Sequence, residues 1–416
     1  MNPIFNEYIQ FLKDKNVKID LQEGYYWLDR QIIKCFDKQG NLHKVARLNV
    51  DNDLNINLTF YKKEKYEKAS WNELIQLNKS KLKQLENKAK KLIIESIEKY
   101  KDYEPIGLTS GGKDSIVTLY LLRQVKPNSL AIFNNTSLDC ADTYKHIKSM
   151  NNVQIINPKE GFYQWRKRLN FIPTRFARAC CTKFKEGELV QQYDHDKKCL
   201  FFMGMRNEES QARSKYQDEW KNNIWGDNWQ AILPIREWSE LDIWLYILAN
   251  NIPINTKYKK GYSRVGCAVA CPYYTKSTWI LDEYWYPKAY QRWQEIIADD
   301  FIKNNKWLIM NCTLEEYMYS WCGGIVRKEP TKEVIKEFAE YNNLNIDVAE
   351  NFFSKKCKCC DKKIKSKEVL GMNMKFLGRN IEEFMCKKHL KEFLKIDNHK
   401  WDEYVKSFKS SGCELF

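Results

Sequence analysis

The hydrophobic positions of the chain follow three successive patterns. Before about residue 70, apolar and polar residues alternate over 22–35 and 42–61, as they do in half-buried strands. From residue 71 to 100, apolar residues recur at helical spacing in a Lys- and Glu-rich stretch, which predicts one long helix. The residues expected on its buried side are Leu74, Leu77, Leu82, Leu85, Leu92 and Ile93.

Between about 100 and 300, short apolar runs alternate with helical segments, a pattern typical of a parallel sheet with helices on both faces. The expected strands are 106–109, 130–133, 153–156 and 199–204. Ligands of such sheets bind beyond the carboxyl ends of the strands. We therefore expect three polar segments to meet at one edge of this sheet: 110–115, 136–139 and 204–213.

The segment 110–115, Ser-Gly-Gly-Lys-Asp-Ser, joins the first of these strands to a helical run. A strand, a glycine turn and a helix start place unpaired backbone N–H groups at the positive end of a helix dipole, which favours an anion. Gly111 and Gly112 have no Cβ, so a phosphate can approach the main chain, and Lys113 adds a positive charge. Asp114 suits an N-cap or a magnesium contact. The alternative is a helix cap with two turn glycines and no ligand.

At 416 residues the chain can form two or three domains with a substantial core. Changes in composition indicate five regions. They are a small β-rich appendage (1–70), a connecting helix (71–100), the α/β domain with the glycine loop (101–300), a helical extension (301–352) and a cysteine- and lysine-rich unit with a tail (353–416).

Lysine and arginine outnumber aspartate and glutamate by 69 to 54, which gives a net charge of +15. This charge favours a polyanionic partner such as DNA or RNA, although an Asn-, Lys- and Ile-rich composition also explains part of it. No apolar run approaches the roughly 18 residues of a membrane span, and the first residues lack the apolar core of a signal peptide. We expect a cytoplasmic protein with no membrane partner.

The chain has 14 cysteines, which in a cytoplasmic protein indicate metal or redox chemistry before disulfides. Five scattered cysteines are expected to be small buried hydrophobes: Cys35, Cys140, Cys199, Cys312 and Cys322. Adjacent residues such as Cys180 and Cys181 cannot easily be two ligands of one small tetrahedral zinc site.

A second group of cysteines lies near the C-terminus. Cys357 and Cys360, followed by Cys386 and His389, have the spacing of a treble-clef or ribbon-like zinc site. Cys359 is an alternative ligand to Cys357. A unit this small has little core, so the metal would supply its folding energy. The Lys-rich surroundings suit contacts with nucleic-acid phosphates.

Four segments, in order, resemble those of one known family. Residues 110–115 are similar to the Ser-Gly-Gly-x-Asp-Ser pyrophosphate-loop (PP-loop) signature of the ATP pyrophosphatases and the phosphoadenosine phosphosulfate (PAPS) reductases. Residues 204–213 match the Gly-x-Arg-x-x-Glu-Ser-x-x-Arg signature of the PAPS-reductase branch, and 234–247 and 252–267 continue the match. The resemblance covers about 100–290 and implies an adenine nucleotide α-hydrolase-like fold.

The resemblance implies that the chain binds ATP or adenylyl sulfate, with Mg²⁺. The implied nucleotide-binding residues are Ser110, Gly111, Gly112, Lys113, Asp114, Ser115, Thr136, Asp139, Gly204, Arg206, Glu209 and Arg213. Lys113, Asp114 and Arg206 are the catalytic candidates among them. By their chemistry, Arg206 and Arg213 can hold phosphate or sulfate bidentately, and Glu209 can orient one of them. The alternative is a solvated helix start with an i,i+4 ion pair.

Relatives with adenylyl-sulfate reductase chemistry hold a [4Fe–4S] cluster with an adjacent cysteine pair and a later Cys-x-x-Cys. This implies a cluster at Cys180, Cys181, Cys267 and Cys271, although the later pair here is Cys-x3-Cys, one residue longer. Zinc, a redox-active disulfide and simple packing remain alternatives.

The PAPS reductases also use a mobile cysteine near the C-terminus to attack sulfur. Cys413 stands in a similar place without the surrounding motif, so it is a catalytic candidate. The alternative is a tail that docks through Leu415 and Phe416.

The function expected from these features is sulfur transfer that uses an adenine nucleotide. In the first version, which resembles DNA phosphorothioation enzymes, ATP is cleaved at its α–β bond to adenylylate a nucleic acid, and sulfur is then inserted. A cysteine desulfurase or another donor would supply that sulfur. In the second version, a sulfonucleotide is reduced to sulfite, with Cys413 as the nucleophile. A non-enzyme alternative is a nucleic-acid-binding zinc protein with an inactive nucleotide domain.

Overall fold

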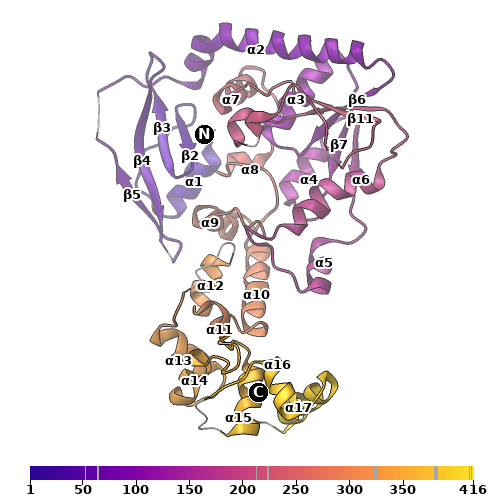
Figure 1. The fold of residues 1–416 in the computed structure, drawn as a ribbon. Helices are drawn as coiled ribbons and strands as arrows, with labels where there is room; N and C mark the ends of the chain where they lie inside the picture. The colour runs from indigo at the N-terminus through magenta and orange to yellow at the C-terminus, as the bar shows by residue number, and fades with distance from the viewer. Residues whose placement is uncertain are drawn as a thin grey trace. The chain divides into compact units, whose positions relative to one another are not determined.

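The computed structural model describes residues 1–51, 53–62, 65–211, 213–222, 224–321, 327–378, 383–411, 413 and 415–416 (Figure 1). The chain forms two compact units. The first contains Met1–Pro173 and Ala177–Gln291, and the second contains Thr174–Phe176 and Arg292–Phe416. Among the described helices, none combines the length and the apolar character that a bilayer crossing requires.

The first unit begins with an antiparallel sheet, as the alternating pattern predicted. Its strands pair in chain order: β1 (Asn2–Pro3), β2 (Tyr26–Asp29), β3 (Ile32–Phe36), β4 (Leu42–Val50) and β5 (Ile56–Phe60). Helix α1 (Asn6–Asp14) was not predicted. It buries Tyr8, Ile9, Phe11 and Leu12, which lie on one side of a helix because their spacing follows the helical repeat.

The long helix is α2 (Trp71–Lys99), which begins with a capping box formed by Ser70 and Glu73. Leu74, Leu82 and Ile93 are buried as expected, but Leu77 is 55% exposed, so that prediction was wrong. At about 100° per residue, the buried positions cover an arc of roughly 100° and Leu77 falls well outside it. Spacing by three residues is therefore insufficient to place a leucine on the core side.

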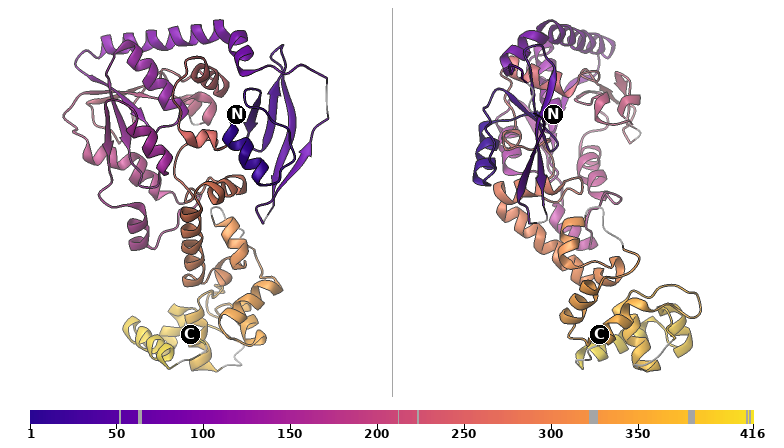
Figure 2. Two further views of the ribbon diagram at one scale, coloured as in Figure 1. Left: turned by 180° about the vertical axis from the view of Figure 1, so that it is seen from behind. Right: turned by 90° about the vertical axis from the view of Figure 1, so that its left-hand side faces the viewer.

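A six-stranded sheet forms the centre of the first unit, with helices on both faces (Figure 2). Its strand order is β10 (Glu219–Trp220), β11 (Trp229–Ile232), β9 (Cys199–Met203), β6 (Glu104–Thr109), β7 (Leu130–Asn134) and β8 (Val153–Ile156). The pairs from β11 to β8 are parallel and β10 is antiparallel. The four expected strands and the α/β class are confirmed, whereas β10 and β11 were not predicted.

Alternate residues of β9 enter different cores, which explains why its sequence is apolar without a break. Leu200 and Phe202 pack in one cluster with Val117 and Trp244, while Phe201 packs in the other with Trp229. The helices of this unit are α3 (Lys113–Val125), α4 (Ala141–Lys148), α5 (Phe162–Leu169), α6 (Glu188–Gln192), α7 (Glu240–Ala249), α8 (Thr256–Lys259) and α9 (Lys276–Trp285).

Helices make up most of the second unit. They are α10 (Pro287–Lys303, which begins in the first unit), α11 (Lys306–Met310), α12 (Leu314–Ser320), α13 (Lys332–Tyr341), α14 (Ile346–Ser354), α15 (Lys367–Leu377), α16 (Lys387–Leu394) and α17 (Asn398–Ser410). Trp293, Phe301, Trp307 and Phe338 are among the side chains buried in this unit. The expected burial is confirmed for Cys35, Cys140, Cys199 and Cys312, and Cys322 lies outside the described residues.

Candidate active site

The glycine loop connects β6 to α3 at the carboxyl end of the parallel sheet. Gly111 has φ +70°, in the left-handed region that glycine tolerates best. Gly112 is the N-cap of α3, and Lys113 is its first residue. Asp114 therefore lies in the first helical turn, so the prediction that it could be the N-cap was wrong. An acidic side chain in the first turn still interacts favourably with the helix dipole.

Part of the loop's hydrogen bonding is internal. Ser110 N donates to Ser115 Oγ at 3.2 Å, and Gly111 N donates to Thr109 Oγ1 at 3.1 Å. Lys113 N donates to the buried hydroxyl of Tyr258 at 2.9 Å. Within the described part of the chain, the backbone N–H groups of Gly112, Asp114 and Ser115 have no acceptor. These donors at a helix N-terminus can bind an anion.

Two buried cations stand beside these donors. Lys113 Nζ lies 3.1 Å from Asp114 Oδ2 and 3.2 Å from Glu240 Oε1. Arg206 Nε donates to Asp114 Oδ1 at 2.5 Å, and Arg206 Nη1 donates to Glu208 Oε2 at 2.8 Å. Both cations are at most 5% exposed. Asp114 therefore joins Lys113 to Arg206, and its carboxylate has the hard oxygen atoms that Mg²⁺ prefers.

The segment after β9 meets the loop because Gly204 follows that strand. Arg206 comes two residues later and reaches Asp114 in the first turn of α3. Glu209 accepts the Arg206 backbone N–H at 3.1 Å and forms an ion pair with Arg213. This exposed i,i+4 pair is the arrangement of the alternative interpretation, so Arg213 as a phosphate ligand stays a prediction.

The segment after β7 forms a turn closed by its own side chains. Asp139 Oδ2 accepts hydrogen bonds from Thr136 Oγ1 at 2.7 Å and from Thr136 N at 3.2 Å. Since β9, β6 and β7 are adjacent and parallel, this turn shares the sheet edge with the glycine loop, as expected. Nucleotide contacts of Thr136 and Asp139 stay predictions.

Both predicted cysteine pairs are attached to the end of β7. Cys180 and Cys181 stand at the start of a π-helical turn (Cys181–Gly187), a conformation found frequently at functional sites. Asn134 Nδ2 holds this turn by donating to the carbonyls of Phe184 and Lys185, both at 3.0 Å. The later pair is held by Ala268 N, which donates to Leu138 O at 2.7 Å.

The two cysteine pairs influence each other's pKa values, since charge on Cys267 raises the pKa of Cys180 and charge on Cys181 raises that of Cys267. A hydrogen bond from Cys180, together with nearby positive charges, lowers the pKa of Cys181 to about 6. The same contact and burial raise the pKa of Cys180. Burial raises the pKa of Cys267 to about 11, against the opposing charge of Lys185. Arg264 Nη2 donates to Cys271 Sγ at 3.0 Å.

The four thiols fit an anionic iron–sulfur cluster in donor type and in their cationic surroundings. Among the described residues, they do not form a group compact enough for a single metal ion. A cluster at these four thiols stays a prediction, with zinc, a redox-active disulfide and packing as its alternatives.

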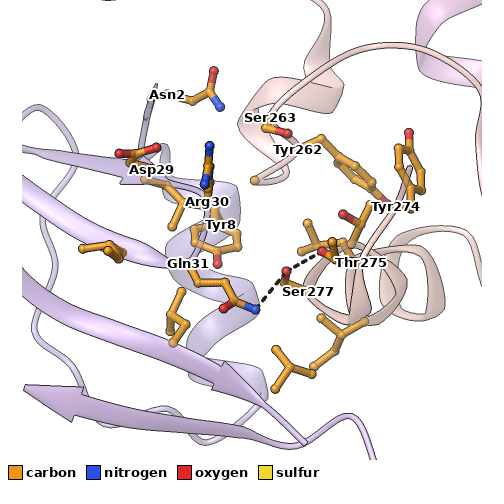
Figure 3. A pocket seen from close by; sticks show the side chains of 18 of the residues that line it. Asn2, Tyr8, Asp29, Arg30, Gln31, Tyr262, Ser263, Tyr274, Thr275 and Ser277 are labelled. Carbon is orange, nitrogen blue, oxygen red and sulfur yellow. Dashed lines mark hydrogen bonds between the residues drawn. The ribbon is translucent and has the colours of Figure 1, made fainter. Parts of the chain in front are cut away.

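A buried polar network supports the cysteine loop. Lys257 Nζ donates to Gly266 O at 3.3 Å and to the Tyr274 hydroxyl at 2.9 Å. The Tyr262 hydroxyl donates to Asp282 Oδ1 at 2.7 Å, and burial raises the pKa of Asp282 to about 6. The stretch that carries this network also forms one wall of a cavity, whose opposite wall is the N-terminal sheet (Figure 3).

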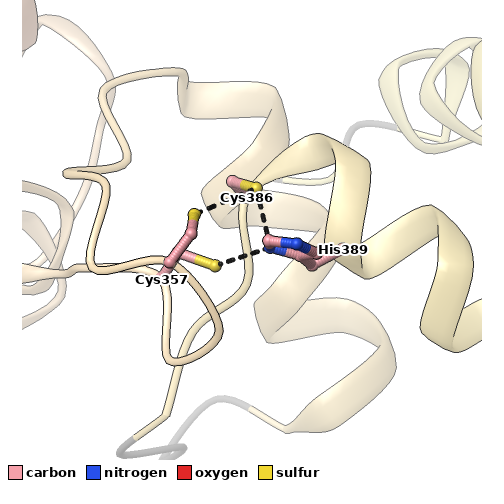
Figure 4. A group of neighbouring side chains, drawn as sticks. Cys357, Cys386 and His389 are labelled. Carbon is pink, nitrogen blue, oxygen red and sulfur yellow. Dashed lines mark hydrogen bonds between the residues drawn. The ribbon is translucent and has the colours of Figure 1, made fainter.

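The second unit contains a compact metal-ligand group. The ligand atoms of Cys357, Cys360, Cys386 and His389 lie within 4.8 Å of one another, so this group could bind a metal (Figure 4). Cys386 is the N-cap of α16 and His389 is in its first turn, as in a treble clef. Despite partial burial, hydrogen bonds from backbone N–H groups and His389 lower the pKa of Cys357 to about 6. Cys359 is exposed and outside the group, so the structure selects Cys357.

The C-terminal tail docks within the second unit. Leu415 is 3% exposed, and the ring of Phe416 lies 5.1 Å from that of Phe408. Cys413 N donates to Phe408 O at 3.1 Å. The docked tail was the alternative interpretation, and a catalytic role for Cys413 stays a prediction.

Sequence reasoning missed four residues near the loop and the cysteines. Tyr258 binds Lys113 N, Glu240 and Glu208 pair with the buried cations, and Asn134 holds the π-helical turn. Tyr258 and Glu240 fall in the motif segments 252–267 and 234–247, which gave the one available signal. Tyr258 and Glu240 contact Lys113 across more than 90 residues of sequence, and no local pattern indicates such contacts.

The six-stranded sheet, the glycine loop and Arg206 define an α/β nucleotide-binding domain. Residues 104–272 match the family described as the phosphoadenosine phosphosulfate reductase domain, so this part of the chain is similar to a PAPS reductase domain. The family match ends before the second unit and begins after the N-terminal sheet.

Three similar proteins illustrate the range of the resemblance. An uncharacterized protein of Methanocaldococcus jannaschii is 28% identical over 300 residues, 69% of this chain and 70% of its own length. An adenosine 5′-phosphosulfate reductase of Lysinibacillus sphaericus is 25% identical over 195 residues, 44% of this chain and 79% of its own length. The crystal structure of PAPS reductase from Candida auris has 17% identity and a TM-score of 0.35, over 45% of this chain and 93% of that one.

Proposed function

We propose that the chain is an ATP-using sulfur-transfer enzyme whose acceptor is a nucleic acid. The observation that carries the proposal is the attachment of both cysteine pairs to the end of β7, the strand beside β6, which leads into the glycine loop. Nucleotide activation and sulfur delivery would therefore occur at one edge of one sheet.

The first step is adenylylation. An acceptor oxygen attacks the α-phosphorus of ATP, the α–β P–O bond breaks, and pyrophosphate leaves. The free N–H groups of Gly112, Asp114 and Ser115 and the Lys113 ammonium hold the pyrophosphate. Arg206 stabilises charge at the α-phosphate, and Asp114 positions Arg206 and would bind Mg²⁺. The Asp114–Arg206 pair at 2.5 Å gives that positioning.

The second step is sulfur insertion. Hydrosulfide derived from a sulfur donor, such as a cysteine desulfurase, attacks the carbon or phosphorus atom that bears the adenylylated oxygen. The bond to that oxygen breaks, and AMP leaves with the oxygen. A cysteine desulfurase carries its sulfur as a persulfide, so a dithiol reductant would first release that sulfur as hydrosulfide and become a disulfide. Cys180, Cys181, Cys267 and Cys271 would hold a [4Fe–4S] cluster, with one thiolate on each iron. Lys185 and Arg264 lie beside these thiols and favour anions there.

The net charge of the chain and a groove in the second unit support a nucleic acid as the acceptor. An open groove beside the metal-ligand group is lined by four lysines and two acids, namely Lys387, Lys388 and Lys391 of α16, its C-cap Lys395, Glu392 and Asp397. With the net charge of +15, this groove suits phosphates, and zinc in the ligand group would stabilise it. Neither feature is required for a substrate as small as a sulfonucleotide.

The second candidate is a sulfonucleotide reductase. The family description and the similarity to an adenosine 5′-phosphosulfate reductase support it. A thiolate, with Cys413 as the candidate, would attack the sulfur and release the adenosine phosphate. A dithiol reductant would then release sulfite from that cysteine and become a disulfide.

Pyrophosphate exchange and sulfite release, measured on the same preparations, test the proposal. Nucleic-acid-dependent exchange of pyrophosphate into ATP should fail in Lys113→Ala and in Gly112→Val. It should persist in Lys126→Ala, an exposed lysine at the other end of α3. Arg206→Ala should weaken nucleotide binding by about 1.5–3 kcal/mol, the value of a hydrogen bond to a charged group. Sulfite release that disappears in Cys413→Ser, with no exchange in the wild type, would establish the reductase instead.

A further inference from the structure

A polar cavity of about 750 Å³ lies within the first unit, between the N-terminal sheet and residues 261–281 (Figure 3). Arg30, Gln31 and Arg47 line it from the sheet, and Arg264 and Tyr273 line it from the other side. This volume is typical of sites that enclose a nucleotide-sized group. The sheet that forms one wall lies outside the matched domain, so the cavity is a feature added to that domain.

The backbone of Arg30 is held in an unfavourable conformation at the cavity. Arg30 occupies the turn between β2 and β3 with φ +55°, a region that disfavours residues with a Cβ. Asparagine holds most of the other positive-φ positions outside glycine, which makes an arginine here unusual. Strain of this kind concentrates at ligand clamps. A glycine would relieve it, so the local conformation does not explain the arginine.

The cavity has an excess of positive charge, because three arginines line it against one carboxylate, Asp29. Arg30, Arg47 and Arg264 form no ion pair with a carboxylate among the described residues, and the adjacent Asp29 is paired with Lys34 at 2.5 Å. Guanidinium groups bind phosphate bidentately, which makes unpaired arginines a phosphate site.

Arg264 links the cavity to the cysteine loop. Arg264 lines the cavity and donates to Cys271 Sγ at 3.0 Å, so a ligand here would lie next to the proposed sulfur site. Gln31 Nε2 donates to Ser277 Oγ at 3.3 Å, which joins the sheet wall to the opposite wall. The two walls are therefore connected by a direct hydrogen bond.

We infer that this cavity binds the sugar–phosphate backbone of a single-stranded nucleic acid and holds the acceptor beside the cysteine set. The inference rests on the proposed function and names where its acceptor binds. ATP itself has the donors of the glycine loop, so the cavity is free for the second substrate. The guanidinium groups of Arg178 and Arg264 lie over the ring of Tyr273, 5.2 Å and 5.8 Å from its centroid, so positive charge gathers at this wall.

Fluorescence anisotropy of the full-length protein with short labelled single-stranded DNA and RNA tests this inference. Arg47→Ala should weaken binding about tenfold and reduce the dependence of log affinity on log salt by about one. Arg30→Gly should weaken binding similarly while its melting temperature stays equal or rises, because glycine relieves the strained turn. Lys44→Ala is the matched control, since Lys44 is exposed on the same strand as Arg47 and does not line the cavity.

Nucleotide binding separates this inference from the proposed function. Calorimetry with ATP should give wild-type affinity for Arg30→Gly and Arg47→Ala. Unchanged oligonucleotide binding in both variants would overturn the cavity as the acceptor site and leave the proposed function standing. Equal losses of ATP and oligonucleotide binding would also overturn it, because the effect would then be global. A wild-type protein that binds no oligonucleotide would overturn both.

Discussion

Gly204 lies in close contact with the backbone of Asp114. A Cβ at Gly204 would come within 2.5 Å of the Asp114 carbonyl carbon and 2.6 Å of Ser115 N. The end of β9 thus packs directly on the first turn of α3. Because Arg206 follows two residues later, the same contact sets the distance over which Arg206 reaches the Asp114 carboxylate.

We predict that Gly204→Ala weakens nucleotide binding and lowers the melting temperature. The added methyl group meets backbone atoms that cannot rotate away, and overpacking of this kind costs about 1–3 kcal/mol. Calorimetric titration with ATP and thermal unfolding measure the two effects. Gly226→Ala is the matched control, since a Cβ there meets only His195 at 3.7 Å. If Gly204→Ala binds ATP with wild-type affinity, the contact between β9 and the first turn of α3 does not influence nucleotide binding.

The apolar runs predicted four parallel strands because each strand is buried on both faces and reads as an unbroken hydrophobic stretch. The glycine loop was predicted from its composition, and the shared edge followed from parallel pairing. Strand β10 has only two residues, so it carries no such pattern. Leu77 was placed wrongly because the width of the buried arc depends on what packs against α2.

The partners of the loop were harder to predict. Tyr258 is 145 residues from Lys113, and Asn134 is 50 residues from Phe184. These contacts are set by the tertiary fold and not by any spacing in the sequence. The zinc-type ligand group was predicted correctly because its four ligands lie in two short local motifs, a turn and a helix start.

We predict that anaerobically prepared protein is brown, absorbs broadly near 400 nm, and contains about four irons per chain. Cys181→Ser and Cys267→Ser should lose this colour, since each removes one thiolate ligand. Cys199→Ala is the control, because Cys199 is buried in β9 and its pKa is raised to about 11 by burial. A colourless wild-type protein after reconstitution with iron and sulfide would eliminate the cluster.

We predict that one zinc ion binds in the second unit and that His389→Ala or Cys386→Ala loses it. Structural zinc contributes on the order of 10 kcal/mol to the folding of such small units, so its loss should also expose 353–416 to proteolysis. Elemental analysis measures the metal. Cys359→Ser tests the choice of ligands, since Cys359 is exposed and outside the group. Zinc lost from Cys359→Ser and retained in Cys386→Ala would contradict the assignment.

We predict that the stability of the folded protein depends on pH through His146, which lies behind the glycine loop. His146 is buried behind it, and a Cβ on Gly111 would lie 3.6 Å from His146 Cδ2. Burial lowers the pKa of His146 below its usual value of about 6.5, and the side-chain Nε2 has no partner among the described residues. The folded state therefore favours the neutral ring.

Below about pH 6.5, His146 is protonated in the unfolded chain but stays neutral in the folded chain. The free energy of unfolding therefore falls as the pH decreases below about 6.5. One such proton changes the free energy of unfolding by at most about 1.4 kcal/mol per pH unit. His146→Gln should remove this part of the dependence, whereas His399→Gln, at an exposed position on α17, should keep it. Melting temperatures of the three proteins between about pH 5.5 and 7.5 provide the measurement. An identical pH dependence in the wild type and His146→Gln would mean that the ring is not held neutral behind the loop.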